Sequence, residues 1–181
     1  RRLTKGEAGK GITVLMRYTL RMLTAQQYER AASLICECDL IRRQENIPGG
    51  EISIGLWVGS EVTPNHVVSD NPDLESAETI LNKLQSGLID EVKSSPVQLS
   101  ACPYCGEALE PQNAYSIHNR HFKTYCPNQD CPFHKDLPVI TVDDDIYDRK
   151  PTLLIGTIDK FARLAWEEKT KSIFAEDGIG L

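Results

Sequence analysis

Long hydrophobic runs are missing from this sequence of 181 residues. No apolar stretch approaches the ~20 residues that a membrane-spanning helix needs, so the sequence contains no candidate membrane span. The first residues, Arg1-Arg2-Leu3, do not resemble a secretion signal and include no initiator methionine, so the chain looks like a piece of a longer protein. We therefore expect a cytoplasmic protein without membrane contact. Internal repeats are also absent, which leaves an ordinary globular domain with room for a small insertion.

Positive charge is in short supply. The chain has 20 Lys and Arg against 26 Asp and Glu, so its net charge is −6. An acidic total argues against a protein that coats nucleic acid without specificity. The charge is uneven, however, because residues 1–43 carry +5 and the remainder carries −11. The basic segment can meet phosphates, although a solvated helix face explains the same bias.

A phosphate-binding loop is also absent, although the glycine-rich residues 6–11 resemble one at first sight. The pattern G-x-x-x-x-G-K-[ST] needs widely spaced glycines and a hydroxyl that binds Mg²⁺ directly after the lysine. Here the glycines are too close together, and Gly11 follows Lys10 in place of that hydroxyl. We interpret this stretch as a flexible loop and not as an ATP site.

What the sequence does contain is an alternation of apolar β-branched runs and helical patterns. Short apolar runs predict buried strands, and stripes of apolar residues at helical spacing predict the helices between them. The expected strands are 12–16, 52–59 and 151–157; the expected helices run from a capping box at Thr24 to near Pro48, from Asn71-Pro72 to Gly87, and over 158–171. The predicted fold class is α/β, with a parallel sheet flanked by helices.

Residues 97–142 differ in character from the rest of the chain. They hold few aliphatic residues but four of the six Cys, three of the four His and five Pro. Such a segment cannot build a core of its own and needs a covalent or metal staple. We therefore predict three parts: residues 1–96 and 143–181 belong to one α/β domain, and residues 97–142 are an insertion.

The four cysteines of this insertion have the spacing of metal ligands. The pattern is Cys-x2-Cys, a gap of twenty residues and Cys-x4-Cys, which is typical of a zinc ribbon with one structural Zn²⁺. The predicted ligands are Cys102, Cys105, Cys126 and Cys131. Three alternatives remain: His134 replaces Cys131, the cysteines form two disulfides, or they hold an iron–sulfur cluster.

The remaining cysteines and histidines have simpler interpretations. Cys36 and Cys38 lie on one predicted helix but about 200° apart around its axis, so they cannot share a metal and are expected to be packing thiols. The histidines His118, His121 and His134 are expected at the surface when they are not ligands.

Two segments resemble motifs of superfamily 2 helicases. Residues 16–27, MRYTLRMLTAQQ, resemble motif Ia, and residues 154–164, LIGTIDKFARL, resemble the later strand-to-helix segment. With the zinc ribbon between them, they are most similar to the helicase proteins of the DISARM anti-phage defence system. The resemblance implies a RecA-like domain, here in part, with an inserted zinc ribbon. It also implies that the sites for ATP and Mg²⁺ lie outside these 181 residues, so the fragment alone should be inactive as an ATPase.

The same resemblance implies a role for particular residues. In a parallel α/β sheet ligands bind at the carboxyl ends of strands, where helix N-termini, hydroxyls and cations meet phosphates. The residues expected to contact the backbone of a single nucleic-acid strand, most simply DNA, are Arg17, Thr19, Arg21, Thr157 and Lys160. Without the resemblance, each has a local explanation as a helix cap or a surface ion partner.

The parent protein would then be an ATP-dependent helicase or translocase in anti-phage defence, with other subunits of that system as possible partners. The alternative is a non-enzymatic module in which the zinc ribbon binds nucleic acid or protein and the α/β part is a scaffold. Two side predictions accompany both readings: Trp57 belongs to the core, and Asp143-Asp144-Asp145 form a solvated acidic turn.

Overall fold

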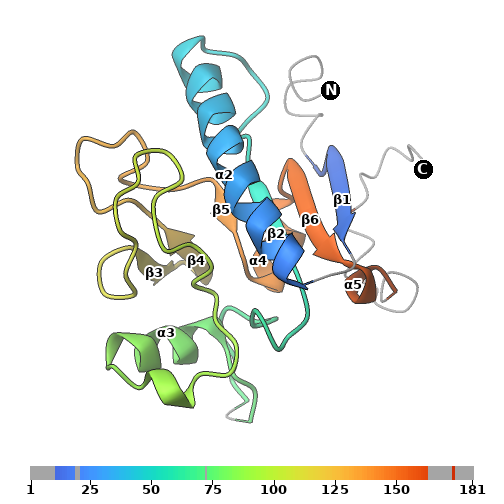
Figure 1. Cartoon of the computed structure of the whole chain (residues 1–181), viewed down its shortest axis with the longest axis vertical. Helices are drawn as coiled ribbons and strands as arrows, with labels where there is room; N and C mark the ends of the chain where they lie inside the picture. Colours follow the sequence, from blue (N-terminus) through green and yellow to red (C-terminus); the bar gives the residue numbers. More distant parts are fainter. Residues whose placement is uncertain (1–10, 19–20, 72, 163–172, 174–181) are drawn as a thin grey trace.

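The computed structural model describes residues 11–18, 21–71, 73–162 and 173, with the backbone alone for residues 21–26. Its strands form a four-stranded sheet and a separate two-stranded hairpin, with helices packed around them (Figure 1). In chain order, the elements are β1 (Val14–Tyr18), α2 (Arg21–Gln44), β2 (Ile54–Trp57), α3 (Ala77–Gln85), the 3₁₀ helix η2 (Ile89–Glu91), β3 (Tyr115–His118), β4 (His121–Thr124), β5 (Val139–Ile140), α4 (Asp143–Arg149), β6 (Leu153–Thr157) and α5 (Ile158–Ala162).

The four-stranded sheet is parallel throughout and has the order β1-β6-β2-β5. This confirms the predicted α/β class with a parallel sheet. Strand β6 comes last in the chain but lies between β1 and β2, because Leu153 pairs with both Val14 and Ile54. The central place suits its sequence: Leu154 and Ile155 are both fully buried on opposite faces, as a strand covered by two layers requires.

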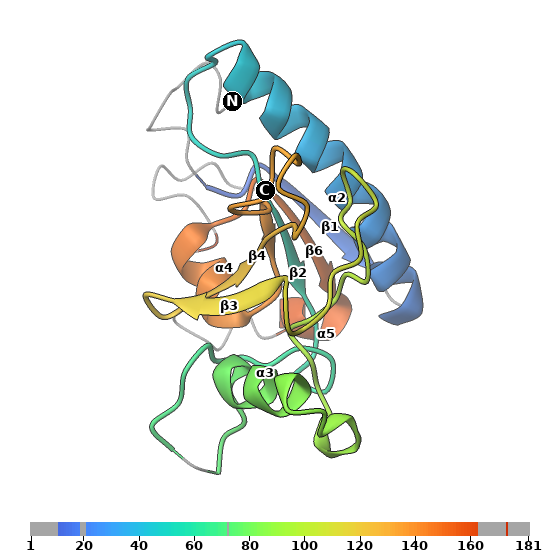
Figure 2. The ribbon, with the colours of Figure 1, turned by 90° about the vertical axis from the view of Figure 1, so that its left-hand side faces the viewer.

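The sheet is sandwiched between helices on its two faces (Figures 1 and 2). Helix α2 covers one face, and the shorter α4 lies on the other. Side chains alternate along each strand, so Leu56 joins the α2 layer while the next residue, Trp57, packs with Ile146 and Leu154 in the α4 layer. Trp57 is fully buried, as predicted.

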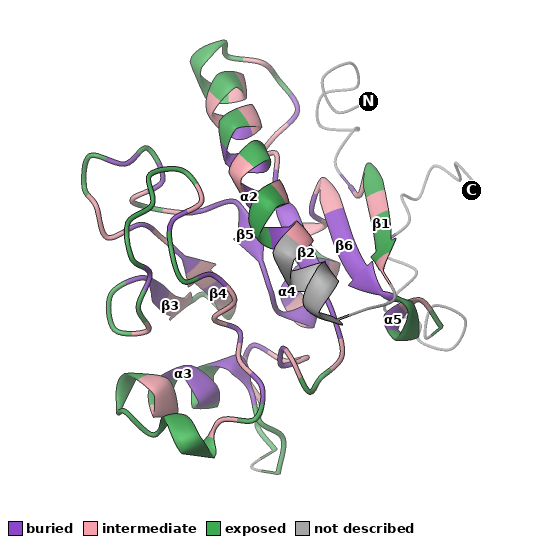
Figure 3. Ribbon diagram, in the orientation of Figure 1, coloured by how far each residue is buried: buried purple, intermediate pink, exposed green. Residues whose placement is uncertain are grey.

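Strand β1 is more exposed than its apolar sequence predicts. Val14 is 48% and Met16 is 36% exposed, whereas the neighbouring β6 is almost entirely buried (Figure 3). The reason is position: β1 is an edge strand among the described residues, paired on one side only. An apolar run predicts a strand, but it does not distinguish an edge from a centre.

The helix boundaries differ from the predicted ones because local capping decides them. Helix α3 begins at Ala77 and not at Asn71, since the hydroxyl of Ser76 caps it by accepting from the amide of Thr79 at 3.3 Å. Asn71 instead makes a turn, its side chain accepting from the amide of Asp73 at 3.0 Å. Gly87 ends this helix with a φ of +81°, as predicted.

Helix α2 begins one turn before the predicted capping box at Thr24. It ends at Gln44, ahead of Pro48, because Asn46 adopts a left-handed φ of 52°. The expected helix over 158–171 is described only as α5, and its remainder lies outside the described residues. None of the described helices is long and apolar enough to span a membrane.

The segment predicted as an insertion is tied closely to the sheet. Val139 and Ile140, placed within it from the sequence, form β5 and pair in parallel with β2. We therefore use the name cysteine-rich segment for residues 97–138 only. Its buried apolar residues share one cluster with the α2 face of the sheet; they are Leu99, Leu109, Ala114, Tyr115, Phe122, Phe133 and Leu137.

Candidate metal centre and the carboxyl end of the sheet

The first cysteine pair lies on a tight turn stabilised by backbone hydrogen bonds. The amide of Gly106 donates to the carbonyl of Cys102 at 2.9 Å, and the amide of Cys102 donates to the carbonyl of Glu107 at 2.7 Å. Gly106 has a φ of +80°, which a residue with a side chain adopts only with strain. The turn therefore places the thiols of Cys102 and Cys105 on the same side, as a chelating pair requires.

The second pair lies on a wider loop that follows β4. The amide of Cys126 donates to the carbonyl of Phe133 at 3.1 Å, and that of Cys131 donates to Asn128 at 3.0 Å. These bonds close the loop despite the four intervening residues between the cysteines. The hairpin formed by β3 and β4 spans the distance between the two pairs, as the length of the gap predicts.

The four sulfur atoms all lie within 4.8 Å of one another. The Cys102 and Cys131 sulfurs are 4.0 Å apart, and those of Cys105 and Cys126 are 3.5 Å apart. A tetrahedron of Zn–S bonds of about 2.3 Å has sulfur–sulfur edges of about 3.8 Å, so the donor set fits one ion. A disulfide needs about 2.05 Å, which the structure does not show. A multi-iron cluster would separate thiolates bound to different irons.

The pKa values of Cys105, Cys126 and Cys131 are shifted, in directions that differ with their surroundings. Burial raises the pKa of Cys126, and it raises that of Cys131 to about 11. Burial opposes ionisation of Cys105 too, but the amide of Glu107 and the neighbouring thiols outweigh it, so its pKa is lowered. The raised pKa values of Cys126 and Cys131 favour the protonated thiols, and a bound cation would displace those two protons.

Helix α2 packs against the residues around the four-cysteine cluster. The guanidinium of Arg43 lies 5.1 Å from the centre of the Phe133 ring, and Tyr104 packs edge-on against the same ring at 5.5 Å. Cys36 of α2 is fully buried in the same apolar cluster as Cys102 and Cys131. Burial raises its pKa far above the ordinary range, which agrees with the predicted role as an inert packing thiol.

One histidine of the cysteine-rich segment is more than a surface residue. The Nδ1 atom of His121 is 2.6 Å from a carboxylate oxygen of Asp145, whose other oxygen accepts from the amide of Phe122 at 2.9 Å. Asp145 is 2% exposed, and burial raises its pKa while His121 lowers it in part. This bond fastens the hairpin to α4. His134 is not among the four clustered ligands.

The three consecutive aspartates are not the solvated turn that the sequence suggested. They form the first turn of α4, and each contacts a different segment. Asp143 binds Lys160 of α5, Asp144 binds His66 of the loop after β2, and Asp145 binds His121. The sequence showed only that they are acidic; their partners are up to 78 residues away along the chain.

Lys160 lies at the carboxyl end of the sheet, as the resemblance implies, but it is turned inward. It is 2% exposed, and its ammonium group binds Asp143 and donates to the side-chain oxygen of Asn65 at 3.1 Å. Burial raises the pKa of Asp143, and Lys160 offsets part of that rise. In this structure its charge is therefore neutralised inside the protein.

The other residues predicted to contact nucleic acid differ in their exposure and hydrogen bonding. Arg17 is exposed near the end of β1. Thr157 is 6% exposed, and its hydroxyl has no hydrogen-bond partner among the described residues. Thr19 and the side chain of Arg21 lie outside the described part of the chain. Tyr18 and Thr157, the last residues of β1 and β6, are paired with each other. The two helicase-like segments therefore meet at the carboxyl end of the sheet.

The fold and the site together define the class: an α/β protein with a parallel sheet and a four-cysteine cluster that can bind a metal ion such as zinc. No known family model matches the sequence. DISARM protein DrmA of Bacillus paralicheniformis is 38% identical to this chain over a 177-residue alignment that covers 94% of the chain. The chain is thus related in sequence to a DISARM protein, and it spans 15% of that relative's length.

Proposed function

We propose that this chain is part of an anti-phage defence protein of the DISARM type. The observation that carries the proposal is the 38% identity to DrmA, which extends over nearly all of the chain and includes both the sheet and the cysteine-rich segment. Because the chain matches only 15% of that protein, the activity belongs to a larger molecule.

Within that molecule we propose a RecA-like domain of an ATP-dependent helicase or translocase. Two features support it: the parallel sheet covered by helices on both faces, and the adjacency of the two helicase-like segments at the ends of β1 and β6. ATP and Mg²⁺ would bind elsewhere in the parent protein. Exposed Arg17 lies where a single strand would cross the carboxyl end of the sheet. The hydroxyl of Thr157, which is buried and has no hydrogen-bond partner among the described residues, would contact that strand only once it is uncovered.

The four cysteines would hold one structural Zn²⁺. Four thiolates complete a tetrahedral shell and leave no open position for water, so the ion would stabilise the fold and take no part in a reaction. Cys102, Cys126 and Cys131 are buried and Cys105 faces solvent, which leaves one side from which an ion can enter.

The defence role can be tested by exchanging segments. The matching part of Bacillus DrmA is replaced by this chain, and phage plating is compared in cells that carry the rest of the defence system. Protection by the exchanged protein is expected.

A matched exchange carrying Arg17→Ala tests the strand contact. It should lose protection and DNA-stimulated ATP hydrolysis while accumulating to the same level. Normal protection by the Arg17→Ala exchange would remove this residue from the strand contact, and no ATP hydrolysis by any version would contradict the motor.

A further inference from the structure

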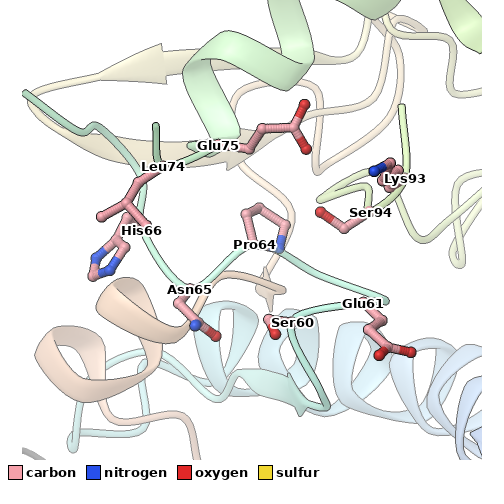
Figure 4. A pocket seen from close by; sticks show the side chains of 9 residues that line it. All are labelled: Ser60, Glu61, Pro64, Asn65, His66, Leu74, Glu75, Lys93 and Ser94. Atoms are coloured by element: carbon pink, nitrogen blue, oxygen red, sulfur yellow. The ribbon is translucent and has the colours of Figure 1, made fainter. Parts of the chain in front are cut away.

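A pocket of about 700 Å³, lined by both polar and apolar surface, opens beside the carboxyl end of β2 (Figure 4). The loop that leaves β2 forms its floor, the approach to α3 forms its roof, and the chain after η2 closes one side. The lining residues are Ser60, Glu61, Pro64, Asn65, His66, Leu74, Glu75, Lys93 and Ser94. Ligands of open α/β sheets bind at this end of the strands, so the pocket lies where a ligand site is expected.

Hydrogen bonds from α4 and α5 hold the loop that forms the floor of this pocket. The side-chain oxygen of Asn65 accepts from buried Lys160 at 3.1 Å, and its carbonyl accepts from the amide of Asp144 at 3.0 Å. The ring of His66 is fastened by Nδ1 to Asp144 at 3.1 Å. Because these partners belong to α4 and α5, the loop keeps its shape without a ligand. Lys160 is thus a positioning residue for the pocket.

The chemistry of the lining points to a ligand with two kinds of polar group. Lys93 forms no ion pair within the described residues, and the hydroxyl of Ser94 lies beside it (Figure 4). Two carboxylates, Glu61 and Glu75, line the same space, although Glu75 is bound to Lys83 at 2.8 Å. The carboxylates disfavour a bare phosphate dianion, and Lys93 disfavours a bare metal cation. A nucleotide of adenine, cytosine or guanine satisfies both, because its phosphate accepts hydrogen bonds and its base carries an amino donor.

We propose that this pocket binds a nucleotide, with its phosphate at Lys93 and the hydroxyls of Ser60 and Ser94 and with the amino group of its base at Glu61. The nucleotide is either one unit of a single strand or a free mononucleotide. The first source rests on the proposed function as a nucleic-acid motor. None of these four residues belongs to the helicase-like segments, so the pocket extends the strand contact beyond the ends of β1 and β6.

The test measures binding of fluorescein-labelled dC20 and dT20 to the zinc-loaded chain by anisotropy over a range of salt concentrations. Lys93→Ala should weaken both by about tenfold and lower the salt slope by about one, as expected for one phosphate contact. The matched control is Lys135→Ala, which removes a lysine of the cysteine-rich segment that is also exposed and also forms no ion pair within the part of the chain that the structure describes; it should change binding less than twofold. Glu61→Ala should remove a preference for dC20 over dT20 of about fivefold, because thymine lacks the exocyclic amine.

A second arm separates the two sources of nucleotide. Addition of dCMP should shift the backbone amide signals of Asn65 and Ser94 in NMR spectra, and Lys93→Ala should abolish those shifts. Strand binding that responds equally to Lys93→Ala and Lys135→Ala, without shifts from dCMP, would overturn the pocket and leave the strand contact intact. Shifts from dCMP without strand binding would support a free-nucleotide site and contradict the strand contact. Neither strand binding nor shifts would overturn both.

Discussion

The sheet and the cysteine-rich segment are stabilised in different ways, although they share one apolar cluster. The sheet is held by layers of side chains such as Trp57, Leu154 and Ile155, whose burial contributes in many small increments. The buried apolar residues of the cysteine-rich segment share the cluster on the α2 face of the sheet, and the segment adds to them a cluster of four sulfur atoms that can bind one ion. Apolar layers tolerate the loss of one contact, whereas a four-ligand shell loses its function with any one ligand. The predictions below probe this difference.

If the four cysteines hold an ion as proposed, its removal should have the largest effect. A zinc chelator should abolish the hydrogen-exchange protection of the amides of Cys102 and Cys131 while that of Ile155 persists, because the binding free energy of structural zinc, about 10–16 kcal/mol, is folding free energy for such segments. Cys126→Ser should do the same without chelator. Cys38→Ser, on α2 outside the cluster, is the control and should change nothing. Equal protection with and without chelator would show that the segment needs no ion.

Lys160→Ala should lower the free energy of unfolding by about 3–5 kcal/mol, because it leaves the buried carboxylate of Asp143 without its cationic partner, although the hydroxyl of Tyr147 still donates to it at 3.5 Å. The midpoint of urea unfolding at pH 7 measures it. Without Lys160 the pKa of Asp143 lies further above its unfolded value, so the native state binds the proton more tightly and the loss should shrink as pH falls toward 5. The double variant Lys160→Met, Asp143→Leu should recover most of the stability. A loss that is constant with pH would mean that Asp143 is not the origin.

Asp145→Asn tests the fastening of the cysteine-rich segment to α4. In the native protein the two oxygens of Asp145 accept hydrogen bonds from His121 and from the amide of Phe122. The substitution should therefore lower the free energy of local unfolding by about 1–3 kcal/mol, measured from the hydrogen-exchange rates of the β4 amides. Asp148→Asn is the matched control: it also faces His121, at 3.6 Å, but is 71% exposed and should cost under about 0.5 kcal/mol. If both variants behave alike, the bond from His121 to Asp145 does not hold the hairpin.

The contact between α2 and the metal centre should contribute least. Arg43→Ala removes the cation above the Phe133 ring. The loss of this cation–π contact should lower the free energy of unfolding by about 0.5–1 kcal/mol. Arg43 also binds Asp39 at 2.6 Å, so a double-mutant cycle with Phe133→Leu is needed to isolate the ring contact. A coupling energy near zero would assign the effect of Arg43 to its ion pairs with Asp39 and, at 4.0 Å, with Glu51.

Much of this architecture is visible in local patterns. The cysteine spacing predicted the cluster, the apolar runs predicted β2 and β6, and Gly87 predicted the end of α3. The errors concern features that local patterns do not contain. Asn71 looked like a helix start because its turn and a helix cap use the same side-chain chemistry. β5 was missed because a two-residue strand has no periodicity to detect.

The sequence by itself determined the four-cysteine cluster and the alternation of strands and helices, since chelate spacing and side-chain periodicity are properties of neighbouring residues. Only the tertiary structure decided that β6 lies inside the sheet, that β1 lies at its edge and that Lys160 is buried against Asp143. It also decided that three adjacent aspartates bind three separate segments. These features depend on which distant parts of the chain pack together, because a buried charge is tolerated only where the fold supplies its partner.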